Sequence, residues 1–145
     1  MTGESGELLP FDSRQVICDL PEYSIQLKLF ILQLNGSLFI WIGDEENKLS
    51  GLSVCLPSRS VISTQHHSTT IYSANGASSN PFSEYEENLS CKISKRYNCP
   101  VFVSISLPYE FVALWNNVNL TTGNTFGQEA ERHLFKNLPT FISSR

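Results

Sequence analysis

The sequence has the length of one domain and a composition that excludes several classes of partner. Its 145 residues are 41% hydrophobic, which is enough for one core. The net charge of −4 argues against nucleic acid or an anionic membrane as the main partner, because either needs a concentrated basic surface. No apolar run approaches the roughly 18 residues of a membrane span, and residues 1–20 contain acids where a signal peptide would be basic and then apolar. We expect a cytoplasmic protein, with the nucleus as an alternative location.

The N-terminal residues 1–20 are predicted to form a flexible tail that ends in a short strand at most. Pro10 and Pro21 would break any helix that ran through this segment. The remaining residues, 21–145, are predicted to form a single domain.

Residues 25–43 are the stretch around which the domain is organised, with two apolar runs that flank an Asn-Gly pair. Asn35-Gly36 favours a type I′ turn, so the two runs are predicted to pair as an antiparallel hairpin. Both faces of this hairpin are apolar near the turn, and no charged residue occurs from Leu29 to Gly43. Each face therefore needs a cover, which is either the chain's own helices or a second protein chain.

A third strand is predicted at residues 49–56, where Leu52, Val54 and Leu56 alternate with smaller side chains. The segment that follows is rich in serine and threonine and too poor in large apolar residues to pack as a core layer. We expect a short edge strand at residues 60–64 and a serine-rich loop at about 65–83.

Two helices are predicted from amphipathic spacing and from capping boxes, in which Ser or Thr precedes Glu or Gln by three residues. The first opens at Ser83, and the second opens at Thr125 and is expected to stop at Pro139. Residues 101–107 and 111–118 are predicted to be two paired strands between the helices. The predicted fold class is α+β, a largely antiparallel sheet of about six strands with two helices in the order β-β-β-β-α-β-β-α.

No catalytic motif is present, since both the nucleophile elbow and the phosphate loop are missing from the sequence. The pair His66-His67 has no third ligand nearby, His133 is expected on the polar face of the last helix, and the acidic turn 44–46 is typical of a solvated loop rather than a cation site. We therefore assign no catalytic residue, no cofactor and no metal ligand. A hydrolase that uses His66 or His133 is the weakest of the functional hypotheses.

The four cysteines, Cys18, Cys55, Cys91 and Cys99, form no Cys-x-x-Cys pair. Three of the four fall within apolar segments. They are predicted to be reduced and mostly buried, behaving as small hydrophobic residues.

Several runs together resemble the proteasome assembly chaperone 4 family. They are Leu38-Phe-Ile-Trp-Ile-Gly43, residues 49–59, Val101-Phe-Val-Ser-Ile-Ser-Leu107, Phe111-Val-Ala-Leu114 and Phe135-Lys-Asn-Leu-Pro-Thr-Phe141. The resemblance extends in order from Gln26 to Phe141, and the run around Trp41 is its most distinctive part. The chain departs from the family pattern in a longer loop near residues 68–83 and a longer, more acidic N-terminal tail, so nothing is carried over to those segments.

The resemblance implies a non-catalytic chaperone subunit that pairs with proteasome assembly chaperone 3. The heterodimer would hold α-type subunits of the 20S core, α5 above all, while the α-ring forms. No nucleotide, metal or other cofactor is expected. The alternative is a small-ligand or peptide-binding module that acts as a monomer, with a pocket beside Trp41 or Trp115.

The partner interface is expected where apolar residues lack charged neighbours. The two tryptophans, Trp41 and Trp115, lie in the two charge-poor hairpins, and tryptophan is enriched in interfaces. Two roles stay open for them, as interface anchors or as core aromatics. The candidate interface residues are Trp41, Leu107, Pro108, Tyr109 and Trp115.

Overall fold

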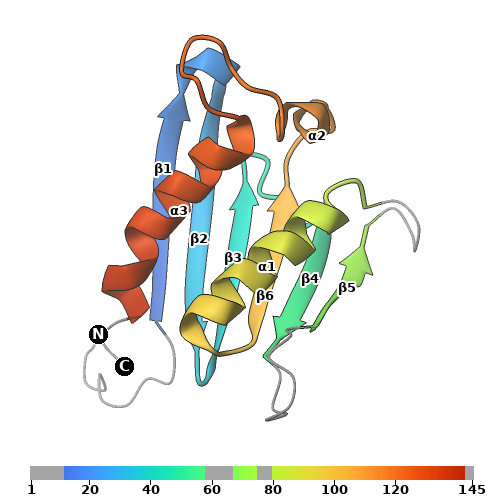
Figure 1. Ribbon diagram of the computed structural model, residues 1–145, viewed down its shortest axis with the longest axis vertical. Helices are drawn as coiled ribbons and strands as arrows, with labels where there is room; N and C mark the ends of the chain where they lie inside the picture. The colour runs from blue at the N-terminus through green and yellow to red at the C-terminus, as the bar shows by residue number, and fades with distance from the viewer. Residues whose placement is uncertain (1–11, 58–66, 75–79, 143–145) are drawn as a thin grey trace.

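A computed structural model describes residues 12–57, 67–74 and 80–142, with side chains to residue 138. Its six-stranded open sheet has the order β1-β2-β3-β6-β4-β5, and the two long helices α1 and α3 lie together on one face (Figure 1). The predicted α+β class is confirmed. The elements are β1 (Asp12–Leu20), the 3-10 turn η1 (Pro21–Tyr23), β2 (Ile25–Leu34), β3 (Ser37–Gly43), β4 (Gly51–Leu56), β5 (His67–Ser73), α1 (Ser83–Tyr97), β6 (Val101–Ser106), α2 (Glu110–Leu114) and α3 (Phe126–Ile142).

The central hairpin forms as predicted, with β2 and β3 paired from Lys28 opposite Gly43 to Leu34 opposite Ser37. Gly36 has a φ of 88°, but Asn35 is not among the described residues with positive φ. The predicted type I′ turn is therefore wrong, because that turn needs positive φ at both central positions. The hairpin joins the rest of the sheet through a parallel pairing of β3 with β6.

The two edge strands of the sheet differ from the prediction. Residues 12–20 form the full strand β1, which pairs with β2 along all nine residues, whereas a tail ending in a short strand was expected. Strand β5 occupies residues 67–73 inside the predicted serine-rich loop. An edge strand needs only one backbone ladder, so its side chains need not be apolar. The strand predicted at 60–64 lies outside the described residues.

The strand predicted at residues 111–118 is wrong, because the chain forms the short helix α2 at Glu110–Leu114 instead. Phe111 and Trp115 are both buried and stand four residues apart, which is the spacing of one helix face. The element order is therefore β-β-β-β-β-α-β-α-α. The described residues contain six strands, the predicted number, but β1 and β5 are unexpected, the strand predicted at 111–118 is a helix, and the one predicted at 60–64 lies outside the described residues.

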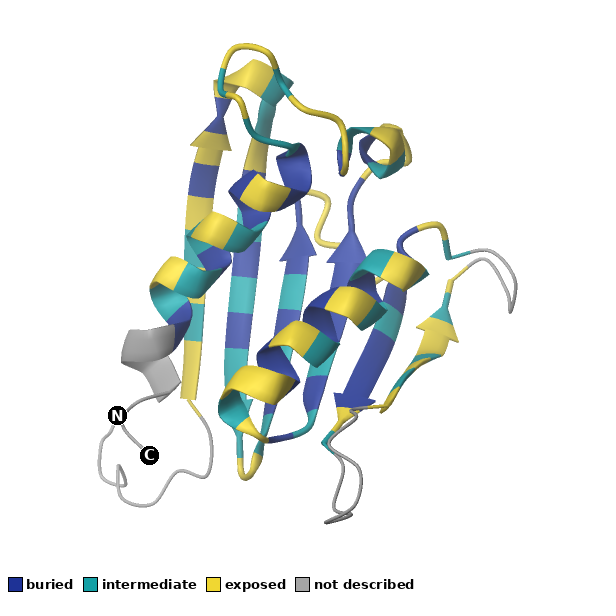
Figure 2. Ribbon diagram, in the orientation of Figure 1, coloured by how far each residue is buried: buried dark blue, intermediate teal, exposed yellow. Residues whose placement is uncertain are grey.

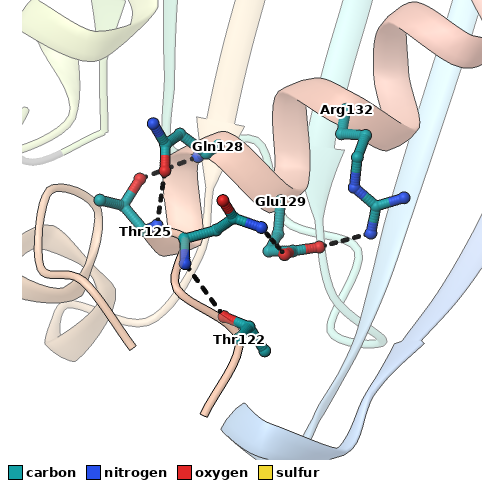
Figure 3. Close-up of polar contacts among 6 residues, drawn as sticks. Thr122, Thr125, Gln128, Glu129 and Arg132 are labelled. Carbon is teal, nitrogen blue, oxygen red and sulfur yellow. Dashed lines mark hydrogen bonds and ion pairs between the residues drawn. The ribbon is translucent and has the colours of Figure 1, made fainter. Parts of the chain in front are cut away.

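The two long helices begin at or next to the predicted residues, and α3 ends later than predicted. Helix α3 has the predicted capping box (Figure 3). The backbone N–H of Gln128 donates to Thr125 Oγ1 at 3.0 Å, and the backbone N–H of Thr125 donates to Gln128 Oε1 at 2.8 Å. It continues past Pro139 to Ile142, so the predicted stop is wrong. Helix α1 begins at Ser83, but the capping box predicted there is wrong, because Glu86 turns toward the sheet and no side chain caps the helix.

The core lies between the helices and one face of the sheet. Along β2 and β3, buried positions alternate with half-buried ones (Figure 2). Fully buried side chains come from β2, β3, β6 and both long helices: Leu27, Leu29, Ile31, Ile40, Ile42, Val101, Val103, Ile105, Ile93, Phe126, Ala130, Leu134 and Leu138. These residues account for one of the two apolar faces of the central hairpin.

Candidate interaction surface

The other face of the sheet carries a second set of large apolar side chains. Cross-strand pairing puts Phe30 opposite Trp41, and Phe39 between Leu32 and Phe102. Phe102 in turn pairs with Val54 of β4. We call this set the open-face patch; its members are Phe30, Leu32, Phe39, Trp41, Leu52, Val54 and Phe102.

The open-face patch has no helix over it in the described part of the chain. Both long helices pack on the opposite face, where α1 contacts β4, β5 and β6 and α3 contacts β2 (Figure 1). Six of its seven members are half-buried, and Val54 is buried. Large neighbouring side chains shield one another here, as in the 6.4 Å edge-to-face contact of Phe30 with Phe39. The patch is thus packed along the sheet but has no second layer.

Charge is almost absent from the centre of this face. Within the fully described strands β2 and β3, Lys28 is the one charged side chain on it, and its Nζ donates to Asn47 Oδ1 at 3.3 Å. A surface that faced water permanently would carry more polar groups on alternate positions of these strands. The open face therefore has the composition of an interface core rather than of a solvated sheet.

Trp41 is fixed in place by its neighbours on β3 and the loop that follows. Its indole N–H donates to the backbone oxygen of Lys48 at 2.8 Å, which satisfies the only polar atom of the ring. A Cβ on Gly43 would clash with the same ring, so the glycine leaves space for the indole to lie along the strand. Trp41 therefore offers an entirely apolar surface to whatever covers the open face.

A hollow of about 290 Å³ lies beside Trp41, between the open-face patch and the loop after β3. Phe30, Phe39 and the exposed Leu49 are among the residues that line it. This volume is near the lower limit for a small-ligand pocket, and it equals the space of a few side chains. The hollow fits an inserted apolar side chain better than a drug-sized molecule.

The candidate interface residues Leu107, Pro108 and Tyr109, which we call the rim, directly follow β6, and the loop after β3 runs at the same end of the sheet. Leu107 is buried, whereas Pro108 is exposed and Tyr109 is 76% exposed. Leu107 and Pro108 line a small hollow together with Lys48, the residue whose backbone holds Trp41. The loop thus connects Trp41 to the rim, and these two predicted parts of the interface lie at the same end of the sheet.

Trp115 lies elsewhere, in the core on the helix side. It is 5% exposed, stacks on Tyr85 at 5.3 Å with 12° between the rings, and meets Phe126 edge to face at 5.7 Å. A Cβ on Gly127 would clash with its indole. Of the two roles left open for the tryptophans, Trp115 takes the core role and is not part of the open face.

The residues considered for chemistry form no reactive cluster in the described ranges. No group of three or more His, Cys, Asp or Glu side chains that could hold a metal ion occurs there. Asp44 Oδ1 accepts the Glu46 amide at 3.0 Å, which is ordinary turn geometry. Burial, followed by Arg132, lowers the pKa of His133, and His66 lies outside the described residues.

None of the four cysteines, all of which lie in described residues, forms a disulfide bond, and all except the half-buried Cys91 are buried, as predicted. None of the helices that the structure describes is both long and apolar enough to cross a membrane.

Sequence reasoning identified Trp41 but missed most of the open-face patch. The alternation of β2 and β3 placed Phe30 and Leu32 on one face, yet it did not show which face the helices would cover. Phe102 was missed because the parallel pairing of β3 with β6 joins residues about sixty positions apart, and Val54 because it reaches this face through the pairing of β4 with β6. The signal that was available is the absence of charge on both faces.

Comparison with known proteins identifies the family. Residues 26–107 match the family model of proteasome assembly chaperone 4, and this range contains the whole open-face patch. No curated protein matches the chain. Among solved structures, a chain from the crystal structure of a novel chaperone complex for yeast 20S proteasome assembly superposes with a TM-score of 0.64, over 92% of this chain and 99% of that one, at 12% identity. At this identity the likeness shows a shared fold.

The family match spans more than half of the 145 residues. The family is one of chaperones and not of enzymes, in agreement with the sequence prediction. The protein therefore belongs to the proteasome assembly chaperone 4 family, and its function is that of a proteasome assembly chaperone.

Proposed function

We propose that this chaperone is one subunit of a heterodimer with proteasome assembly chaperone 3, and that its open face is the pairing surface. The heterodimer promotes assembly of the 20S core α-ring by binding α-type subunits, α5 foremost. It acts in the cytoplasm, with the nucleus as an alternative location.

The open-face patch is the observation that carries this proposal. Its seven members form a continuous apolar surface over four strands, without a covering helix in the described residues. Leaving a few hundred Å² of such surface in water costs several kcal/mol, at roughly 25 cal/mol per Å². A second sheet packed about 10 Å away is the usual way to cover such a face. A partner with a similar open sheet fits this requirement.

The exposed end of the sheet supplies a second contact region in this proposal. Pro108 and Tyr109 project at the end of β6, at the same end as the loop that holds Trp41. An exposed tyrosine beside an apolar surface is typical of interface rims and anchors. We assign this end to partner contacts together with the open face.

Pairing is tested by co-expression of the full chain with proteasome assembly chaperone 3, followed by co-purification and light scattering. We expect a heterodimer for the wild type, and loss of co-purification for Phe39→Asp because a charge would be buried without a partner. Leu120→Asp is the matched control, because Leu120 is 96% exposed and lies outside the open-face patch. Circular dichroism and thermal unfolding check that both variants fold.

Three outcomes contradict the proposal. One is a folded Phe39→Asp chain that pairs like the wild type, and another is a wild-type chain that stays a soluble monomer in the presence of the partner. A monodisperse monomer is what the alternative function, a small-ligand or peptide-binding module with its pocket beside Trp41, requires. Failure of the purified heterodimer to retain isolated α5 would contradict the α-subunit part alone.

A further inference from the structure

A buried carboxylate ties helix α1 to the sheet, on the face away from the open-face patch. Glu86 lies in the first turn of α1 and is fully buried. Its Oε1 accepts hydrogen bonds from Ser53 Oγ at 2.7 Å and Asn80 Nδ2 at 3.0 Å. Its Oε2 accepts one from the Ile105 amide at 2.9 Å. One side chain thus connects α1 with β4, with β6 and with the residues that precede the helix.

Gly51 makes the space for this carboxylate. The pairing of β4 with β6 covers Ser53 to Cys55, and the same register continued would place Gly51 opposite Ile105. A Cβ on Gly51 would clash with Asn80 and lie 3.0 Å from Glu86 Oε2. The short β4–β6 pairing leaves the Ile105 N–H without a backbone acceptor. Glu86 therefore accepts the hydrogen bond of this N–H group.

A second acid joins the network from the next residue of the helix. Glu87 is half-buried, and its Oε2 accepts a hydrogen bond from Thr70 Oγ1 of β5 at 2.8 Å. Thr70 Oγ1 lies 3.0 Å from Ser53 Oγ. A row of three oxygen-to-oxygen contacts therefore leads from Glu86 through Ser53 and Thr70 to Glu87.

These three contacts need three protons, and the two hydroxyls supply only two. With both carboxyl groups ionised, Ser53 donates to Glu86 and Thr70 donates to Glu87. The two hydroxyl oxygens then face each other at 3.0 Å without a proton between them. One proton on either carboxyl group completes the row, because each group then donates to the next in a single direction.

The surroundings favour such a proton. Strands β4 and β6 carry no charged side chain. His67, at the start of β5, pairs with Leu56 and lies on the open face, away from Glu86. Glu87 is the charged group that acts on Glu86. The nearby thiol of Cys55 stays neutral, since burial raises its pKa to about 12. Burial likewise raises the pKa of Glu86 to about 6, against the opposing effect of its hydrogen-bond donors.

We propose that Glu86 and Glu87 share one proton through the hydroxyls of Ser53 and Thr70, and that this proton fixes edge strand β5 to helix α1. Within the described residues, strand β5 has its backbone ladder on β4 alone. Its side-chain link to the rest of the fold is the contact of Thr70 with both Ser53 and Glu87, together with a longer hydrogen bond of 3.5 Å from Ser68 Oγ to Glu87 Oε1. Loss of the proton breaks one contact of that link.

The test is a carbon-13 NMR titration of the glutamate carboxyl groups in the full chain. In the wild type we expect the Glu86 carboxyl to titrate near pH 6. Thr70→Val removes the relay but keeps the Glu87 charge, and it lowers the proton affinity of Glu86 at least tenfold, about one pH unit. Glu87→Gln lowers it as well, because the amide supplies the missing donor. Glu84→Gln, at an exposed position of the same helix, leaves it unchanged.

Amide hydrogen exchange measures the effect on β5. We expect the protection factors of β5, relative to those of β6, to fall above the pH of the titration in the wild type and to stay constant in Glu87→Gln. An unchanged Glu86 titration in Thr70→Val would overturn the shared proton and leave burial alone as the cause of the raised pKa. A wild-type pair that is ionised throughout pH 5 to 8 would also overturn the shared proton. Wild-type β5 protection that does not depend on pH would overturn the link to the strand.

Discussion

The two faces of the central sheet are built from the same kinds of side chain and differ in what lies on them. Ile40 and Phe39 are adjacent on β3, yet Ile40 is fully buried under the helices and Phe39 is half-buried on the open face. Alternation along a strand puts them on opposite sides. An apolar face alone therefore does not define a core. A face becomes core when this chain covers it, and interface when another chain does.

The largest expected effect is on the covered face. Ile40→Ala truncates a fully buried side chain and leaves a cavity under the helices. We expect the free energy of unfolding to fall by about 2–5 kcal/mol. Urea denaturation of the isolated chain measures this loss. Phe39→Ala serves as the control and should cost clearly less. Equal losses at the two neighbouring positions would remove the distinction between the faces.

Substitutions on the open face are expected to affect pairing more than stability. Trp41→Ala is expected to weaken pairing with the partner chaperone by about 2 kcal/mol, roughly thirtyfold in Kd, because an apolar anchor beside the hollow is lost. Isothermal titration calorimetry gives the affinity. Trp115→Phe, in the helix-side core, should alter stability and leave the affinity within a few-fold. A Trp41→Ala chain that pairs with unchanged affinity would rule out the open face as the pairing surface.

The covered face should also respond to pH through Glu86. Its pKa is raised in the folded state, so the folded chain binds more protons than the unfolded chain between the ordinary value of 4.5 and about 6. Stability therefore falls as pH rises through this window, by about 2 kcal/mol in total. Unfolding titrations of the wild type and of Glu86→Gln measure the contribution, which is the pH-dependent part of their difference. A difference that does not vary with pH would contradict it.

The smallest expected effect lies at the start of α3. Thr125→Ala removes the hydroxyl oxygen that accepts the hydrogen bond of the Gln128 backbone N–H, and a lost N-cap costs about 1 kcal/mol of stability. Thermal unfolding detects a loss of this size. Thr125→Ser keeps the hydroxyl oxygen and should restore most of the stability. Pairing should be unaffected, because α3 packs on the covered face; a change in affinity would link the two faces.

The sequence predicted best where local patterns decide the structure. Alternating apolar residues identified β2, β3 and β6, and the Thr125–Gln128 capping box identified the start of α3. The Asn35-Gly36 pair placed the turn correctly, although its backbone differs from type I′. In each case the information lies within a few residues, so no distant contact is needed to read it.

The errors occurred where tertiary contacts outweigh local patterns. The segment 111–118 was predicted as a strand from its β-forming residues, but burial of Phe111 and Trp115 against Phe126 requires a helical turn. Strand β5 has few apolar residues and depends on its backbone ladder and on Thr70. Most of the open-face patch was missed because the strand order of the sheet is set by pairings distant in sequence.

The positions of the two tryptophans allow intrinsic fluorescence to report when the open face is covered. Trp115 is already shielded from solvent, so its emission will not respond to events at the sheet surface. Trp41 is half-buried beside the hollow, and covering the open face would transfer its ring into a drier environment. A blue shift of intrinsic fluorescence on mixing with a tryptophan-free partner would therefore come from Trp41 alone. No dye or label is required to follow the kinetics of assembly.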